Sequence, residues 1–335
     1  MNHRNTKRSP SRVFAAALIT SALFMATTSS VIQAAEIFPN KPLRIIVPFA
    51  PGGASDQLAR MMGQKLTEGL GQPVVVENKP GAGGIIGAEA GARASADGYT
   101  LLLAAAGFMA VNPAVYPKLP YDPIKDFKPI TLLVKAPLLL VAHPSLPVKN
   151  TEEFIAYAKS NPGKVTIGNG GVGTAQHLGG VYFEKTAGIN VVHVPYKGSA
   201  PATTDLLGGV VDAQFDNLVT LLPYIKTGKL RPLGVASLTS IAALPDTATM
   251  SEKALPNFET GTWYGIVAPA GTPTAIVGRI DNELQKILKM PDVQEKLTGQ
   301  GLLPSGLNGE DLDSFIRSEI NIYGKIVKEA GVTVD

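Results

Sequence analysis

The sequence predicts an α/β fold of two domains, each with a mainly parallel sheet flanked by helices. The chain has 335 residues, which is long for one core and sufficient for two domains. Short apolar strands alternate with glycine-rich loops and helices, the pattern of a parallel sheet wrapped by helices. One such loop, residues 48–56, has a counterpart of the same kind at residues 168–174.

The first glycine loop lies between a predicted strand and a predicted helix. Leu43–Val47 is a short apolar, β-branched run typical of a buried strand, and residues 58–70 carry apolar side chains at helical spacing. Between them the Gly52–Gly53 pair leaves the backbone uncovered, and Ser55 or Asp56 is expected to cap the helix. Bare amides at a helix N-terminus favour an anion, although a capped turn without a ligand has the same pattern.

The first half of the chain continues this alternation. Residues 73–78 predict a second strand, residues 79–84 a glycine loop, residues 85–90 a helix of small residues, and residues 100–106 a third buried strand. Five prolines between residues 113 and 129 predict an extended connection.

The middle of the chain repeats the pattern. Thr131–Val134 and Leu138–Val141 are candidate strands, and Thr151 is expected to cap a helix. The second glycine loop follows a strand and opens a helix that contains His177. The strands expected here cover residues 164–167, 190–194, 210–215 and 230–236.

The C-terminal part predicts one more strand and two long helices. Residues 263–268 form an apolar strand, and Thr272 followed by Pro273 predicts a helix start with Thr272 as the cap. A final helix is expected from about Glu310 to Ala330. By analogy with two-lobed binding folds, we expect these helices to pack back on the first domain.

Residues 1–35 have the features of a cleaved signal peptide. Four basic residues precede an apolar run at Val13–Met25 that is too short to span a bilayer, and small residues follow at Ala34–Ala35. Cleavage is expected after Ala34. Removal takes away four of the 30 basic residues and none of the 27 acidic ones, so the mature chain carries a net charge of −1. This balance gives no electrostatic support for nucleic-acid binding.

Composition and motifs exclude several functions. The chain has no cysteine, which rules out disulfides, thiol nucleophiles and cysteine-ligated metals. Gly168-x-Gly170-x-x-Gly173 fits the dinucleotide fingerprint, but the next strand ends without the acidic residue that would hold a ribose. No P-loop ending, Gly-x-Ser-x-Gly elbow or histidine pair with zinc spacing occurs. We therefore expect no catalytic residue, no metal and no cofactor.

Two side chains keep alternative interpretations. His177 lies one turn inside the helix after the second glycine loop, where ligand contact and helix packing are equally consistent with its position. Asp216 ends a strand at the edge where ligands bind in open α/β sheets, but a turn carboxylate fits as well.

These residues together resemble the Bug family, the periplasmic solute-binding receptors of tripartite tricarboxylate transporters. The resemblance covers essentially the whole mature chain, and Lys79 stands where an arginine is more usual. The matching segments are residues 42–56, 74–88, 97–103, 169–180, 192–209 and 264–273.

The resemblance implies a fold and a ligand class. The fold is the type II-like periplasmic binding protein, with two α/β lobes, two crossing segments and a ligand cleft between the lobes. Lobe 1 is expected at residues 36–137 plus 262–335, and lobe 2 at residues 138–261. Ligands of this family are small carboxylates, aliphatic or aromatic, held mainly by backbone amides and waters, and the partner is the membrane permease of the transporter. We expect a monomer in the periplasm that binds no nucleic acid.

Carried onto this sequence, the resemblance and the glycine loops predict the ligand-binding residues. Ser55 and Thr174 are expected to donate hydroxyl hydrogen bonds, Tyr196 to form a wall, and Asp216 or Asn217 to contact the far end of the ligand. The full set is Phe49, Ala50, Gly52, Gly53, Ala54, Ser55, Asp56, Asn169, Gly171, Gly173, Thr174, Ala175, His177, Tyr196, Asp216 and Asn217.

Two alternatives to a transport receptor use the same scaffold. A ligand-sensing receptor for a signalling partner would have the same pocket. An α/β enzyme, such as a reductase or hydrolase, would need a cofactor-binding acid or a nucleophile with a base, and the sequence contains neither pattern.

Overall fold

The computed structural model describes residues 1–3 and 38–330, with side chains placed as far as residue 328. Of the described residues, 41–330 form one compact unit, to which residues 1–3 and 38–40 do not belong. The predicted signal peptide at residues 1–35 lies almost wholly outside the described residues. No helix among the described residues is long and apolar enough to cross a membrane.

The first group of strands surrounds β1 (Leu43–Val47), whose side chains are almost all buried. β1 pairs in parallel with β2 (Val74–Asn78) and β3 (Thr100–Ala105), and β9 (Gly261–Pro269) pairs antiparallel with β3. These strands and the helices packed on them are called the first lobe below. Its flanking helices are α2 (Ala54–Leu70), α3 (Ile85–Ala92) and α10 (Thr274–Leu288).

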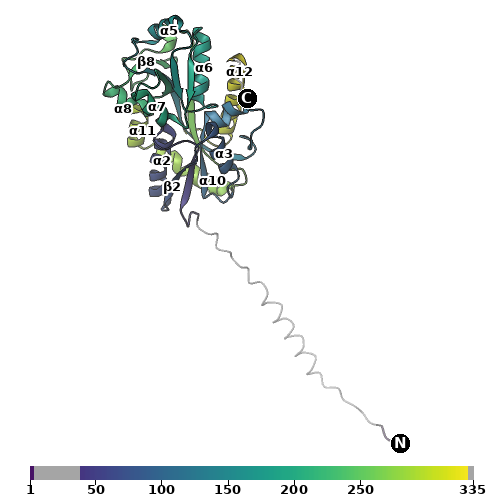
Figure 1. Ribbon diagram of the computed structural model, residues 1–335. Helices are drawn as coiled ribbons and strands as arrows, with labels where there is room; N and C mark the ends of the chain where they lie inside the picture. Colours follow the sequence, from purple (N-terminus) through teal and green to yellow (C-terminus); the bar gives the residue numbers. More distant parts are fainter. Residues whose placement is uncertain (4–37, 331–335) are drawn as a thin grey trace. The chain divides into compact units, whose positions relative to one another are not determined.

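The second group of strands is called the second lobe. β5 (Thr166–Asn169) lies between β6 (Val192–Pro195) and β7 (Ala213–Asn217) and is parallel to both. β8 (Arg231–Ala236) completes the group by pairing with β4. Around these strands lie α5 (Thr151–Ser160), α6 (Ala175–Ala187), α7 (Ser199–Leu207), α8 (Leu218–Lys226) and α9 (Met250–Lys253) (Figure 1).

One long strand, β4, pairs with strands of both groups. β4 (Phe127–Ala142) pairs with β9 as far as Pro137, and its last five residues pair with β7 and β8. The expectation of two separate strands here was wrong, because Pro137 continues the ladder opposite Gly261 instead of interrupting it. All pairs made by β4 and β9 are antiparallel, so the sheets are parallel only toward their outer edges.

The strand β4 also divides the core of the second lobe. Leu138 and Leu140 face one apolar cluster with Phe183 and Phe215, whereas Leu139 and Val141 face a second cluster. This division follows from the alternation of side chains along a strand.

The C-terminal segment returns to the first lobe, as expected. α10 packs on α2 and β4, and α12 (Gly309–Ala330) packs on β4 and on η2 (Gly107–Val111). The predicted final helix is thereby confirmed, and its Ile316, Tyr323 and Val327 side chains are buried. The remaining elements are η1 (Ala82–Gly84), α4 (Asn112–Val115), α11 (Pro291–Gly299) and β10 (Leu303–Pro304).

Two predicted helix caps were wrong by one residue. Asn150, not Thr151, caps α5, because its side chain accepts a hydrogen bond from the Glu153 amide at 2.8 Å. α10 begins at Thr274 with Pro273 as its cap residue, while the Thr272 hydroxyl donates to the Pro269 carbonyl at 2.7 Å. At α5 the neighbouring Asn150 oxygen takes the capping position, and at α10 no side chain caps the helix because the Thr272 hydroxyl is bonded to Pro269.

Candidate functional site

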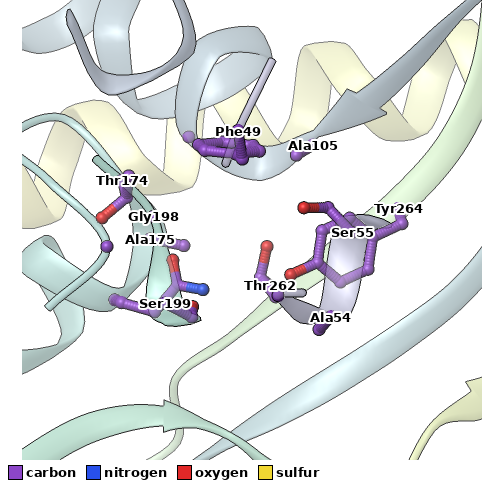
Figure 2. A pocket seen from close by; sticks show the side chains of 14 residues that line it. Phe49, Ala54, Ser55, Ala105, Thr174, Ala175, Gly198, Ser199, Thr262 and Tyr264 are labelled. Atoms are coloured by element: carbon purple, nitrogen blue, oxygen red, sulfur yellow. The ribbon is translucent and has the colours of Figure 1, made fainter. Parts of the chain in front are cut away.

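An inner cavity lies where loops of both lobes meet. Its lining comes from the loops after β1, β3, β5 and β6 and from β9, and the described residues that form it include no charged side chain. The cavity is small, with about 20 Å³ open to the centre of a water molecule. The lining residues are Phe49, Gly53, Ala54, Ser55, Ala105, Gly107, Gly170, Thr174, Ala175, Gln176, Gly198, Ser199, Thr262 and Tyr264 (Figure 2).

Three helices begin at this cavity. The first amides of an α-helix have no partner within the helix, and the aligned peptide dipoles place partial positive charge at this end. Two of the helices belong to the second lobe and one to the first, so their amides converge from opposite sides. The cap and first residue of each line the cavity: Gly53 and Ala54 for α2, Thr174 and Ala175 for α6, and Gly198 and Ser199 for α7. This arrangement favours an anion without a lysine or arginine.

Hydrogen bonds to the Asp56 carboxylate fix the turn after β1. Its carboxylate accepts hydrogen bonds from the Gly52 amide at 3.0 Å, from Arg60 at 3.0 Å and from Asn78 at 2.9 Å. Burial alone would raise the pKa of Asp56, but these hydrogen bonds and the Arg60 charge outweigh it and hold the pKa below its usual value. The expected cap at Ser55 or Asp56 was wrong: Gly53 is the cap residue, and Asp56 shapes the turn without lining the cavity.

The turn after β5 is held by two side chains of its own. Asn169 Oδ1 accepts from the Gly171 amide at 2.9 Å. The Thr174 hydroxyl accepts from the His177 amide at 3.2 Å and donates to the Gly171 carbonyl at 2.7 Å. Its one proton is therefore already used, and the expectation that Thr174 donates to a ligand is not supported by this geometry.

Four other hydroxyl-bearing residues line the cavity: Ser55, Ser199, Thr262 and Tyr264. Figure 2 shows Ser55, Thr262 and Tyr264 facing the space between the lobes, with the Phe49 ring at one edge. The Tyr264 oxygen accepts from Asn217 Nδ2 at 2.9 Å, and Gln176 and Thr262 are further hydrogen-bond partners of this hydroxyl and its proton. Burial, followed by the nearby Asp216, raises the pKa of Tyr264, so the hydroxyl keeps that proton.

A buried carboxyl group lies beneath the lining. Asp216 is fully buried and accepts from Gln176 at 3.2 Å, from Gln214 at 2.8 Å and from the Asn217 amide at 2.8 Å. Burial raises the pKa of Asp216, although these hydrogen bonds and one from Ser199 oppose the shift. Asp216 and Asn217 were expected to touch the far end of a ligand, but neither lines the cavity, and they orient Gln176 and Tyr264 instead.

A wider outer compartment adjoins the inner cavity and shares Phe49 and Gly170 with it. It measures about 490 Å³ and is lined by the aromatic rings of Tyr116 and Tyr196, with Lys197 as its charged side chain. The Tyr196 hydroxyl donates to Asp205 at 2.7 Å. Burial and then this carboxylate raise the pKa of Tyr196 to about 12.

His177 lies away from both spaces. Its ring packs 5.9 Å from the ring of His193, measured between centroids. Burial, followed by the charge of His193, lowers the pKa of His177 to about 4, so the ring is neutral at ordinary pH. Of the two interpretations of this residue, the position favours packing.

The structure brings together only part of the predicted set. Six of the predicted residues line the inner cavity: Phe49, Gly53, Ala54, Ser55, Thr174 and Ala175. Gly171 and Tyr196 line the outer compartment only. The others line neither space: Ala50, Gly52, Asp56, Asn169, Gly173, His177, Asp216 and Asn217. Ligand contact by any of these residues stays a prediction.

Sequence reasoning missed eight lining residues: Ala105, Gly107, Gly170, Gln176, Gly198, Ser199, Thr262 and Tyr264. A signal for two of them was present, because Lys197-Gly198-Ser199 is a third strand-to-helix turn with a glycine before the helix. Thr262 and Tyr264 alternate along β9, so they point to the same face once that strand is identified.

Comparison with known proteins identifies the family. The model of the "Tripartite tricarboxylate transporter family receptor" matches residues 58–332. Protein BugT of Bordetella pertussis is 37% identical over 298 residues, which cover 89% of this chain and 91% of BugT.

Solved structures agree in fold. Rpa4515 of R. palustris, determined with adipate, is 34% identical with a TM-score of 0.87 and covers 89% of this chain and all of its own. MatC from Rhodopseudomonas palustris, with bound malate, is 32% identical with a TM-score of 0.82 and covers 87% of this chain and all of its own. The periplasmic binding protein BugD, 38% identical with a TM-score of 0.85, covers 89% of this chain and all of its own, and it confirms the two-lobed periplasmic binding protein fold. This chain belongs to the receptor family of the tripartite tricarboxylate transporters.

Proposed function

We propose that this protein is a periplasmic receptor that binds the carboxylate group of a small organic acid in the inner cavity and delivers the acid to the membrane permease of a tripartite transporter. The observation that carries the proposal is the convergence of three helix N-termini on a cavity whose lining, among the residues that the structure describes, has no charged side chain. Each helix end contributes about 0.3–1 kcal/mol toward an anion. Each hydrogen bond from an amide to a charged acceptor adds about 1.5–3 kcal/mol.

The dimensions of the two spaces support a ligand larger than its carboxylate head. The inner cavity is small, about 20 Å³ by the same measure that gives about 490 Å³ for the outer compartment, and the outer compartment is partly aromatic. The carboxylate head is expected in the inner cavity and the remainder of the acid toward Tyr116 and Tyr196. Binding of adipate by Rpa4515 and of malate by MatC agrees with this class of ligand.

Calorimetry and thermal shift against a panel of acids test the proposal. Malate, adipate and aromatic diacids form the panel, and adipamide is the neutral control for adipate. At least one acid is expected to raise the melting temperature, and adipamide is not, because a neutral amide gains less from the helix ends. Ser55→Ala is expected to weaken binding, whereas Ser314→Ala, at an exposed position on α12, is not.

A melting temperature that no acid raises, or that adipamide raises as much as adipate, contradicts the proposal. A loss of affinity of equal size in both serine variants contradicts the assigned place of the carboxylate.

The proposal includes three further points. The lobes are residues 36–137 plus 262–335 and residues 138–261, residues 1–35 are the export signal, and the receptor acts as a monomer. The sheets support the lobe boundaries, because the partners of β4 change between Pro137 and Leu138. Mass spectrometry of the exported chain and light scattering test the other two points.

A further inference from the structure

Loops of the two lobes come close at several places beside the inner cavity, and two of these contacts carry the argument. At the first, the Ala50 amide, which follows β1, donates to the Lys197 carbonyl, which follows β6, at 3.2 Å. Gly198 lies so close to this pair that an added Cβ would be 3.2 Å from the Ala50 nitrogen. Backbone therefore meets backbone across the cleft.

The second contact is closer. Gly83, in the turn η1 of the first lobe, faces the Val172 carbonyl of the second lobe, and a Cβ added at Gly83 would lie 2.1 Å from that oxygen. Real Cβ atoms essentially never come within 3.0 Å of another heavy atom, and the atom in the way belongs to backbone. Only glycine at residue 83 allows the two loops to come this close.

The side chain of Asn112 contacts both Gly83 of the first lobe and Gly173 of the second lobe. Its Nδ2 donates to the Gly83 carbonyl at 3.4 Å, and a Cβ added at Gly173 would lie 2.1 Å from its Oδ1. Oδ1 is buried and accepts no hydrogen bond from the described residues. Separation of the lobes would admit water to this oxygen, so the closed contact holds an unsatisfied acceptor that favours opening.

We propose that Gly83 and Gly173, one on each lobe, form a close backbone contact that is made when the lobes close, here called the latch. The missing Cβ of Gly83 sets how far the lobes close on the ligand. Gly83 lines the outer compartment but not the inner cavity, and its added Cβ would meet the Val172 carbonyl of the other lobe. It therefore acts on the carboxylate as a positioning residue, through the closed arrangement of the helix N-termini. The inference rests on the proposed function for its ligand, and on the structure alone for the contact.

A matched pair of variants separates closure from backbone strain. Gly83 has φ +60°, and Gly188, which ends α6, has φ +61°. Alanine is strained equally at both positions, but a Cβ at Gly188 would meet nothing within 4 Å. Gly83→Ala therefore adds a collision between the lobes that Gly188→Ala lacks.

Lobe closure is measured with spin labels on introduced cysteines at Gln64 of α2 and Lys159 of α5. Both positions are exposed, and the chain has no cysteine of its own. In the background of wild type and of Gly188→Ala, malate or adipate is expected to increase a short-distance population that is also detectable without ligand. In the background of Gly83→Ala this population is absent, and calorimetry without labels gives at least tenfold weaker binding.

Three outcomes overturn the latch. The first is that Gly83→Ala closes and binds like Gly188→Ala. The second is that Gly83→Ala is less stable than Gly188→Ala without ligand, because the collision would then belong to the fold rather than to closure. The third is a wild-type protein without a short-distance population under any condition. Failure of wild type to bind either acid, with the short population present, counts against the proposed function alone.

Discussion

Asp216 is a carboxylic acid buried beneath a cavity whose lining favours anions. It accepts hydrogen bonds from two glutamine side chains and from the Asn217 amide. One of these donors, Gln176, lines the cavity, and Ser199 is another lining residue that bonds to the carboxyl group. At the scale of the residue, Asp216 therefore orients groups that face the ligand, at the expense of a buried charge.

The replacement Asp216→Asn removes this titration. Because burial raises the pKa of Asp216 above its usual value of 3.8, the folded state holds the proton more tightly than the unfolded state. Ionisation therefore lowers the stability of wild type, an effect absent below the usual pKa and complete above the raised pKa. The stability of Asp216→Asn relative to wild type is expected to rise with pH across this window.

Urea unfolding of both proteins at a series of pH values measures this difference. Other titrating groups are shared and cancel. A relative stability that stays constant, or that falls with rising pH, contradicts the assigned direction of the pKa shift.

At the scale of the element, the starts of α2, α6 and α7 place the amides. Their positions are set by turns, in which Asp56 holds the first and Asn169 and Thr174 hold the second. The third starts at Gly198, whose φ of +131° suits glycine. The cavity is therefore a property of three helix ends, and loosening one of them is expected to weaken ligand binding.

Loss of the cap at Thr174 tests this relation. Thr174→Ala removes the cap of α6, which is expected to cost about 0.5–2 kcal/mol of stability, and carboxylate binding is expected to weaken roughly fivefold or more, equivalent to about 1 kcal/mol. The control is Thr249→Ala, which removes the capping box of α9 at a similar cost to stability. Chemical denaturation and calorimetry report both quantities. Equal affinities in the two variants would contradict the prediction that ligand binding depends on the start of α6.

The elements were largely predictable, but the site was predictable only in part. Apolar runs such as Leu43–Val47 report burial directly, so most strands and helices follow from them. Hydrogen-bond partners are not encoded so locally, which is why the Thr174 proton and the Asn150 cap were misjudged. The contribution of Tyr264 depends on the pairing of β9 with β3 and β4, and that pairing joins residues far apart in sequence.

At the scale of the whole receptor, β4 and β9 connect the two lobes. β4 changes its partners at Pro137, and β9 begins opposite this residue at Gly261. The ligand loops lie on both sides of these strands, so the complete set of amides exists only when the lobes are together. An anion accepts hydrogen bonds from more amides in the closed state than in the open state. Binding of an anion therefore stabilises the closed state.

The central claim is that first-turn amides of three helices hold the carboxylate. Nuclear magnetic resonance of the ¹⁵N-labelled receptor during titration with an acid that binds in calorimetry tests it most directly. The amide signals of Ala54, Ala175 and Ser199 are expected to shift downfield together and to give one affinity. Binding that leaves these three signals unchanged would contradict the account.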